Sequence, residues 1–268
     1  MAERRVRRRR RTSLGERGRA IYLVPNLVTT AALMLGFWSI TLSIRGEFDR
    51  AALAIVLAAI ADMLDGRIAR ATKSTSPFGV EYDSMSDLVS FGLAPALLFY
   101  NWTLIPLGPR GWLIAALFAL CAALRLALFN VKAHQKEQLH YEGLPSTFAG
   151  GFLAVCVWFT HWLGLEPPFT PILGMTITSG FVLLALLMVS RVPYPSLKLI
   201  KLEGKRAYPT LVAIVIFAVA ILLNHEPLMF GLGVTFLLSG PVYWQTLRRR
   251  ARAGVMEEAP RESGGDVG

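Results

Sequence analysis

Long apolar segments alternate with short polar ones along most of this chain, and the apolar segments are close to 20 residues long. A helix of about 20 apolar residues crosses the hydrocarbon core of a bilayer. The pattern therefore predicts an all-α integral membrane protein, a bundle of eight transmembrane helices. The predicted spans are 25–44, 51–73, 79–101, 111–133, 146–164, 171–189, 208–224 and 228–247.

The second and third of these spans are unusual because charged residues interrupt them. Each still carries a long apolar run, 51–61 in one and 88–100 in the other. An ionised side chain at the centre of a helix in hydrocarbon costs about 2.5–3.5 kcal/mol on insertion scales, so such residues usually mark a functional site. We therefore expect the chemistry of this chain between residues 62 and 87.

Composition and charge support the membrane interpretation and predict an orientation. Of 268 residues, 54% are hydrophobic and only 17% are charged, which is too apolar for an ordinary soluble domain. If both termini lie on one side, that side holds every Lys and Arg except Arg45, Arg50 and Arg110. The positive-inside rule then predicts cytoplasmic termini in a multi-pass protein of the cell (inner or plasma) membrane. The charged segment 62–87 would open to the cytoplasm.

The two ends of the chain are expected to lie outside the bilayer. Residues 1–24 are predicted to form a basic cytoplasmic tail with a short interfacial helix over 14–24, and 248–268 a disordered cytoplasmic tail. The arginine-rich run 4–11 favours contact with anionic lipid headgroups over nucleic-acid binding. The predicted transmembrane domain is therefore 25–247, with membrane lipids and no nucleic acid as partners.

Four aspartates within the charged segment are spaced to share helix faces. Asp62 and Asp65 are three residues apart, and Asp83 and Asp87 are four apart, so each pair lies on one face of its helix. A short turn between the helices would bring the pairs together. Four converging carboxylates require a counter-charge, and oxygen ligands suit Mg²⁺ or Mn²⁺. Two such ions, about 4 Å apart, would clamp a phosphoryl group.

Neighbouring residues add to this pattern. Gly66 and Gly79 lie on the same faces as the aspartates, where missing side chains would let the two antiparallel helices approach. Arg70, at the cytoplasmic end of its helix, is placed to hold a phosphate. A cation transporter or a buried salt-bridge network would also explain the acids. A transporter does not explain a phosphate-binding arginine at position 70 together with Gly66 and Ser76.

The aspartates belong to a longer string with fixed spacing, D-x2-DG-x2-AR-x8-G-x3-D-x3-D, which runs from Asp62 to Asp87. At its eight fixed positions the chain resembles the CDP-alcohol phosphotransferase family, and the resemblance extends over roughly 20–200. Within that family it is similar to the bacterial enzymes that use serine. The resemblance implies transfer of a phosphatidyl group from CDP-diacylglycerol to the hydroxyl of L-serine, giving phosphatidylserine and CMP. It also implies a homodimer.

The same resemblance implies roles for matched positions. Asp62 and Asp83 would bind both metal ions, Asp65 would complete one metal site and Asp87 the other. Asp87 would also act as the general base on the incoming hydroxyl. Contacts with the CDP part of the donor are implied for Pro25, Asn26, Leu27, Val28, Gly66, Arg70 and Ser76.

The acceptor is less well defined by the sequence. Arg125, inside the fourth span, is predicted to bind the carboxylate of serine or a donor phosphate, and pairing with a buried acid remains equally open. Asn130 is a further candidate contact. Glycerol 3-phosphate and inositol phosphate remain alternative acceptors, although a single arginine in the span favours an amino acid. Four tryptophans near span ends are expected to anchor the membrane interface: Trp102, Trp112, Trp158 and Trp162.

Overall fold

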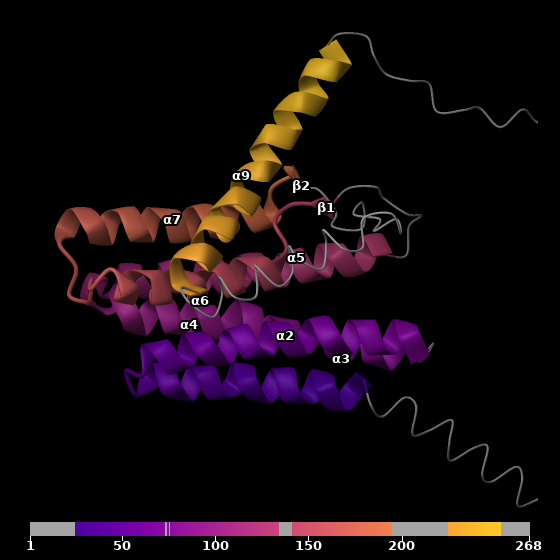
Figure 1. Ribbon diagram of the computed structural model, residues 1–268, viewed down its shortest axis with the longest axis horizontal. Helices are drawn as coiled ribbons and strands as arrows, with labels where there is room; N and C mark the ends of the chain where they lie inside the picture. Colours follow the sequence, from indigo (N-terminus) through magenta and orange to yellow (C-terminus); the bar gives the residue numbers. More distant parts are fainter. Residues whose placement is uncertain (1–24, 73, 75, 134–140, 195–224, 253–268) are drawn as a thin grey trace, which may run out of the picture.

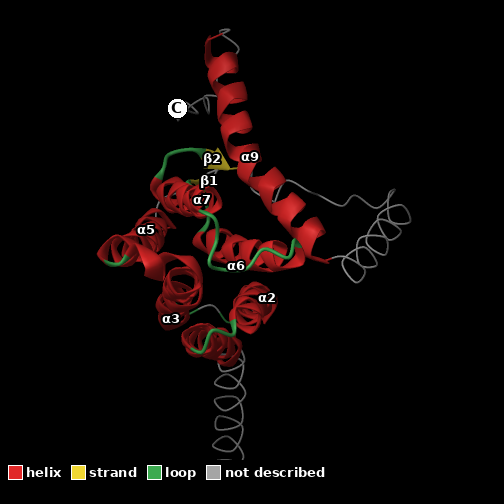
Figure 2. Ribbon diagram, turned by 90° about the vertical axis from the view of Figure 1, so that its left-hand side faces the viewer, coloured by secondary structure: helices red, strands yellow, loops and turns green. Residues whose placement is uncertain are grey.

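The computed structural model describes residues 25–72, 74, 76–133, 141–194 and 225–252, and it is almost entirely helical. Most helices run side by side as one bundle, and α9 crosses the bundle at a steep angle (Figure 1). Figure 2 looks nearly along the helices and shows α9 beside α6. The helices are the N-terminal helix Pro25–Ile44, α2 Phe48–Thr72, α3 Pro77–Asp87, α4 Ala94–Phe99, α5 Pro109–Ala133, α6 Ser146–Trp162, α7 Pro171–Val189 and α9 His225–Arg252.

A helix is present at every predicted span that falls within the described residues. The predicted span 208–224, the predicted interfacial helix 14–24 and the end of the chain from 253 lie outside them. α9 continues to Arg252, past the predicted boundary at 247. Proline occupies the first turn of several helices, including α3 and α7, where its missing N–H costs no hydrogen bond.

The third predicted span is longer than 79–101. A continuous helical run covers Pro77–Leu107, which is 31 residues. Within it, α3 is followed by the π-helical segment η1 Leu88–Leu93, by α4, by a second π-helical segment η2 Tyr100–Leu104 and by the 3₁₀ turn η3 Ile105–Leu107. π-helical segments are rare and often lie at functional sites. Here η1 begins directly after Asp87.

Two neighbouring helices approach the backbone of η1 closely, and glycine makes both approaches possible. A Cβ atom on Gly36 of the N-terminal helix would lie 2.7 Å from the Cα atom of Ser90. One on Gly150 of α6 would lie 2.8 Å from the carbonyl oxygen of Phe91. The Ser90 hydroxyl also donates a hydrogen bond to the carbonyl of Ala32 at 3.0 Å. The helix that carries Asp83 and Asp87 is thus fixed from both sides.

Five helices among the described residues are long and apolar enough to cross a membrane: Pro25–Ile44, Pro77–Leu107, Pro109–Val131, Pro171–Val189 and Glu226–Thr246. α2 carries the charged residues of the second predicted span, and α6 has 17 residues, at the lower limit for a span. Large apolar side chains such as Met34, Ile172 and Met175 are exposed on the outside of the bundle. Such a surface suits lipid, so the fold is that of an all-α membrane protein.

The bundle core is aromatic at the end away from the aspartates. The ring of Phe181 on α7 stacks on Phe99 and Phe118 at 4.0 and 4.8 Å between centroids. Trp102 packs edge-on against Phe99 and Phe169 and is only 5% exposed. The expectation that Trp102 anchors the membrane interface is therefore wrong, because its position near a span end does not reveal which side of the helix it occupies.

A two-stranded sheet joins the loops that follow α5 and α7. β1 Tyr141–Glu142 pairs antiparallel with β2 Pro193–Tyr194, with Tyr141 opposite Tyr194. Beside it, the Gly143 N–H donates to the Val192 carbonyl at 2.9 Å. Tyr194 is fully buried against Phe236 of α9, and this burial raises the pKa of its phenol. The sheet therefore holds the loop before α6 to the end of α7.

Candidate functional site

Three aspartates from two helices meet in one group. Asp62 on α2 and Asp83 and Asp87 on α3 each offer a carboxylate oxygen, and these oxygens all lie within 4.8 Å of one another. All three residues are partly buried. The Oδ1 atom of Asp83 is buried and has no hydrogen-bond partner within the described part of the chain. An orphaned carboxylate oxygen beside two further carboxylates fits a hard divalent cation, which takes oxygen ligands.

Asp65 lies one turn further along α2 and is held differently. Its side chain is 4% exposed and accepts a hydrogen bond from the Thr29 hydroxyl at 2.6 Å. It lies outside the group of three whose oxygens are within 4.8 Å. The predicted convergence of carboxylates is therefore confirmed for Asp62, Asp83 and Asp87, and the predicted metal-binding role of Asp65 remains a prediction.

The start of α3 brings several of the predicted donor-binding residues together. Ser76 caps this helix, and its hydroxyl accepts a hydrogen bond from the Gly79 N–H at 3.0 Å. A Cβ atom on Gly79 would lie 3.1 Å from the Ser76 hydroxyl and 3.3 Å from the Asn26 side-chain oxygen. Asn26, Ser76 and Gly79 thus share one small space. The positive end of the α3 helix dipole points into this space, which favours an anion there.

Arg70 reaches back along α2 towards Gly66. A Cβ atom on Gly66 would lie 3.5 Å from a guanidinium nitrogen of Arg70. The prediction that Gly66 and Gly79 line a direct approach of α2 to α3 is therefore wrong, because Gly79 faces Asn26 and Gly66 faces the arginine. Leu27, at the start of the N-terminal helix, is 72% exposed, while Pro25 is buried and Val28 half-buried.

The two predicted acceptor residues lie on α5 and contact different elements. Arg125 is 7% exposed, and its Nε–H donates to the Leu144 carbonyl at 3.3 Å. Its guanidinium also lies 5.6 Å from the ring centroid of Phe129. The amide nitrogen of Asn130 donates to the Ser84 hydroxyl at 2.9 Å. Asn130 therefore reaches the residue next to Asp83, while Arg125 is tied to the loop before α6.

Two residues of this site were not predicted from the sequence, Thr29 and Ser84. Thr29 contacts Asp65 across 36 positions of the chain, so no local spacing reveals the pair. A signal was still available, because Thr29, Ala32 and Gly36 form a stripe of small residues on the N-terminal helix. Such a stripe indicates close helix packing. Ser84 carried no signal apart from its position beside Asp83.

Comparison with known proteins adds to this geometry. The family model described as CDP-alcohol phosphatidyltransferase matches residues 22–239, which include every site residue above. A CDP-diacylglycerol–serine O-phosphatidyltransferase of Helicobacter pylori is 34% identical over 225 residues, covering 84% of this chain and 92% of the relative. One from Bacillus subtilis is 33% identical, covering 65% and 91%. An archaetidylserine synthase of Methanothermobacter thermautotrophicus is 32% identical, covering 64% and 69%.

Proposed function

The chain belongs to the CDP-alcohol phosphatidyltransferase family, and we propose on that basis that it transfers a phosphatidyl group from CDP-diacylglycerol to the hydroxyl of L-serine. The products are phosphatidylserine and CMP. The family predicted from the eight fixed positions is confirmed. Serine as acceptor is supported by the names of relatives such as those of Helicobacter pylori and Bacillus subtilis. This chain aligns with 92% and 91% of the length of these two relatives.

The observation that carries the proposal is the group of three carboxylates within 4.8 Å on α2 and α3. Asp62, Asp83 and Asp87 would hold two divalent cations, Mg²⁺ or Mn²⁺, with Asp65 completing one of the two sites. Bound cations of this kind offset the negative charge of a diphosphate and of a leaving nucleotide. The buried Oδ1 of Asp83, which lacks a partner among the described residues, supports this donor set.

The chain's own residues then bind and orient the donor. Arg70 supplies a positive charge for the diphosphate, and the N-terminus of α3 with Ser76 supplies a second favourable position for an anion. Asn26 lies beside Gly79 in the same space. Pro25, Leu27, Val28 and Gly66 are proposed as further donor contacts. The acyl chains of the donor remain in the lipid, against the exposed apolar side chains of the bundle.

The transfer is a direct displacement. The serine oxygen forms a bond to the phosphorus of the phosphatidyl group, and the bond from that phosphorus to CMP breaks. Serine's hydroxyl is a very weak acid, so it needs a base placed to take its proton as the new bond forms. Asp87 is proposed as that base. Arg125 and Asn130 are proposed to contact serine.

The orientation of the protein follows from charge. We propose eight spans forming a transmembrane domain over 25–247, with both flanking segments, 1–24 and 248–268, in the cytoplasm of a homodimer in the plasma membrane. Of 28 Lys and Arg residues, 25 would then be cytoplasmic. The carboxylates would open to the cytoplasm, where serine and CMP are soluble.

One experiment tests both the reaction and the acceptor. Purified protein is incubated with CDP-diacylglycerol, Mg²⁺ or Mn²⁺ and one alcohol at a time, and both CMP and the lipid product are measured. Serine should release CMP, and glycerol 3-phosphate and inositol phosphate should not. If glycerol 3-phosphate or inositol phosphate releases CMP and serine does not, that alcohol is the acceptor in place of serine. If no alcohol releases CMP, the proposed reaction is rejected.

The role of Asp87 has its own test. Asp87→Asn removes the base and one metal ligand while keeping the size of the side chain, so turnover should fall to background. Binding of CDP-diacylglycerol should remain measurable, since Arg70 and the start of α3 are unchanged. Unchanged turnover in this variant would reject Asp87 as the base.

A further inference from the structure

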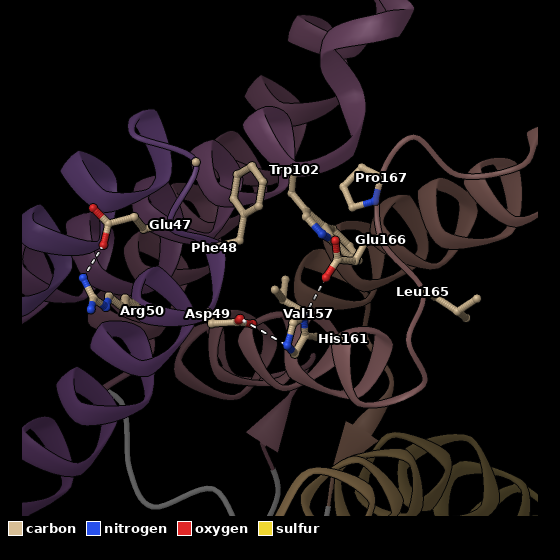
Figure 3. A pocket seen from close by; sticks show the side chains of 11 residues that line it. Glu47, Phe48, Asp49, Arg50, Trp102, Val157, His161, Leu165, Glu166 and Pro167 are labelled. Atoms are coloured by element: carbon tan, nitrogen blue, oxygen red, sulfur yellow. Dashed lines mark hydrogen bonds and ion pairs between the residues drawn. The ribbon is translucent and has the colours of Figure 1, made fainter.

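A pocket of about 510 Å³ opens at the end of the bundle opposite the carboxylates. Figure 3 shows the side chains that line it. It is lined by the turn between the N-terminal helix and α2, by η2, and by the end of α6 with the loop that follows. Asp49 in its wall precedes Asp62 on α2 by 13 residues, which corresponds to about 20 Å of helix. The pocket is therefore separate from the carboxylate site, and its volume lies in the range of small-ligand sites.

Charged side chains gather around His161 in this pocket. Figure 3 shows His161 between Asp49 and Glu166, and its ring nitrogens lie 3.7 and 3.3 Å from their carboxylate oxygens. The nearby Glu47 is neutralised by Arg50 at 2.7 Å. A single imidazole carries at most one positive charge, so beside the two carboxylates of Asp49 and Glu166 the pocket keeps an excess of negative charge. A cationic group is therefore favoured inside it.

Aromatic side chains narrow the class of cation. Phe48 and Trp102 both line the pocket. Trp102 is 5% exposed, and no residue in the described part of the chain accepts a hydrogen bond from its indole N–H. This N–H is not sealed off from the pocket that Trp102 lines, and an anionic or carbonyl oxygen of a ligand there would give it an acceptor. Aromatic faces beside carboxylates are favourable surroundings for an ammonium group.

We propose that this pocket binds the headgroup of a phospholipid that ends in an ammonium group. The ammonium lies in the pocket beside His161, within reach of the Asp49 and Glu166 carboxylates, and a phosphate oxygen accepts the hydrogen bond of Trp102. A bare metal ion would leave this N–H and the aromatic rings unused. The apolar border supports a lipid over a soluble amine, because Leu165 lines the pocket and is 37% exposed, and the nearby Ile44 is 70% exposed.

The test uses full-length protein in detergent and native mass spectrometry to count bound ligand. Three probes are titrated: dihexanoyl phosphatidylethanolamine, dihexanoyl phosphatidylglycerol with the same chains but no ammonium, and phosphoethanolamine without chains. We expect the phosphatidylethanolamine to bind about tenfold more tightly than the other two. The double variant Asp49→Asn/Glu166→Gln should remove this preference. Trp102→Phe, which keeps a ring but loses the N–H, should weaken binding several-fold, about fivefold.

The matched control is Glu226→Gln on α9, which changes an acid outside the pocket and should leave lipid binding unchanged. Release of CMP by each variant at the parent's rate shows that the carboxylate site remains folded. Equal affinity for the two lipids, or unchanged binding by the double variant, would overturn the proposal. If phosphoethanolamine binds as tightly as the lipid, the ligand of the pocket is a soluble amine and the lipid proposal is overturned. Failure of the parent to release CMP would reject only the proposed transferase.

Discussion

Substitution of Gly143 by alanine tests how the acceptor side of the site is held. Gly143 has φ +81°, a backbone region in which a side chain costs about 1–2 kcal/mol. An added Cβ would also lie 2.5 Å from the Met188 carbonyl oxygen and 2.8 Å from that of Ser190. The loop must move to relieve this contact, and the 2.9 Å hydrogen bond from Gly143 to Val192 then weakens by about 1 kcal/mol. Together we expect a loss of about 3 kcal/mol in the free energy of unfolding.

The movement should also reach Arg125. The next carbonyl after Gly143, that of Leu144, accepts the Arg125 Nε–H at 3.3 Å. A displaced Leu144 shifts the guanidinium that we propose contacts serine. Misplacing a substrate-binding group by about 1 Å can lower a rate by about 100-fold. For this smaller, indirect shift we expect KM for serine to rise about tenfold. KM for CDP-diacylglycerol should change little, because the donor residues lie on other elements.

Substitutions at two other glycines separate the cost of the backbone conformation from the cost of crowding by the added Cβ atom. Gly46 has φ +78° but open space around it, so Gly46→Ala should lose only the backbone contribution of about 1–2 kcal/mol. Gly151 lies in α6 with open space, so Gly151→Ala should stabilise by about 0.5–1 kcal/mol. Thermal unfolding in detergent and KM for both substrates are measured for all three. If Gly143→Ala is no less stable than Gly46→Ala, the crowding argument fails. If it is destabilised while KM for serine is unchanged, Arg125 does not serve the acceptor.

Three further predictions concern the donor and metal side. Thr29→Val leaves the buried Asp65 without its 2.6 Å hydrogen bond, which should lower the free energy of unfolding by about 1–3 kcal/mol and lower CMP release. The control is Thr41→Val, which should be nearly neutral because the hydrogen bond of Thr41 is exposed. Arg70→Gln should raise KM for CDP-diacylglycerol about tenfold in steady-state kinetics, because it removes a charge-assisted contact with the donor. An unchanged KM would reject the role of Arg70 in donor binding. Chelation by EDTA should abolish CMP release, and added Mg²⁺ or Mn²⁺ should restore it; activity that survives chelation would reject the metal site.

The positions of the helices could be predicted because length and apolar character are local properties of a sequence. The helices at Pro25–Ile44 and Pro171–Val189 match their predicted ranges. The extension of the third span to Leu107 could not be predicted in the same way. Its last part consists of π-helical and 3₁₀ turns, and these leave no distinct pattern of apolar positions.

The site could be predicted only where it depends on spacing within a helix. Asp83 and Asp87 share a face because they are four residues apart, and with Asp62 they meet as expected. The interpretation of Gly79 failed because spacing within one helix does not reveal which neighbouring helix its glycine face meets. The structure instead brings Asn26 of the N-terminal helix against Gly79. Contacts between elements distant in sequence were the part that spacing could not supply.

These contacts make the N-terminal helix a part of the site rather than only a membrane anchor. The hydroxyl of Ser86 donates to the Thr29 carbonyl at 3.2 Å, and the hydroxyls of Thr30 and Tyr82 lie 2.8 Å apart. Both contacts join this helix to α3 within one turn of Asp83 or Asp87. A carboxylate in an apolar bundle needs partners that hold it in place, and Thr29 provides one for Asp65. Since the same helix carries Asn26, its position couples the aspartates to the space proposed for the nucleotide.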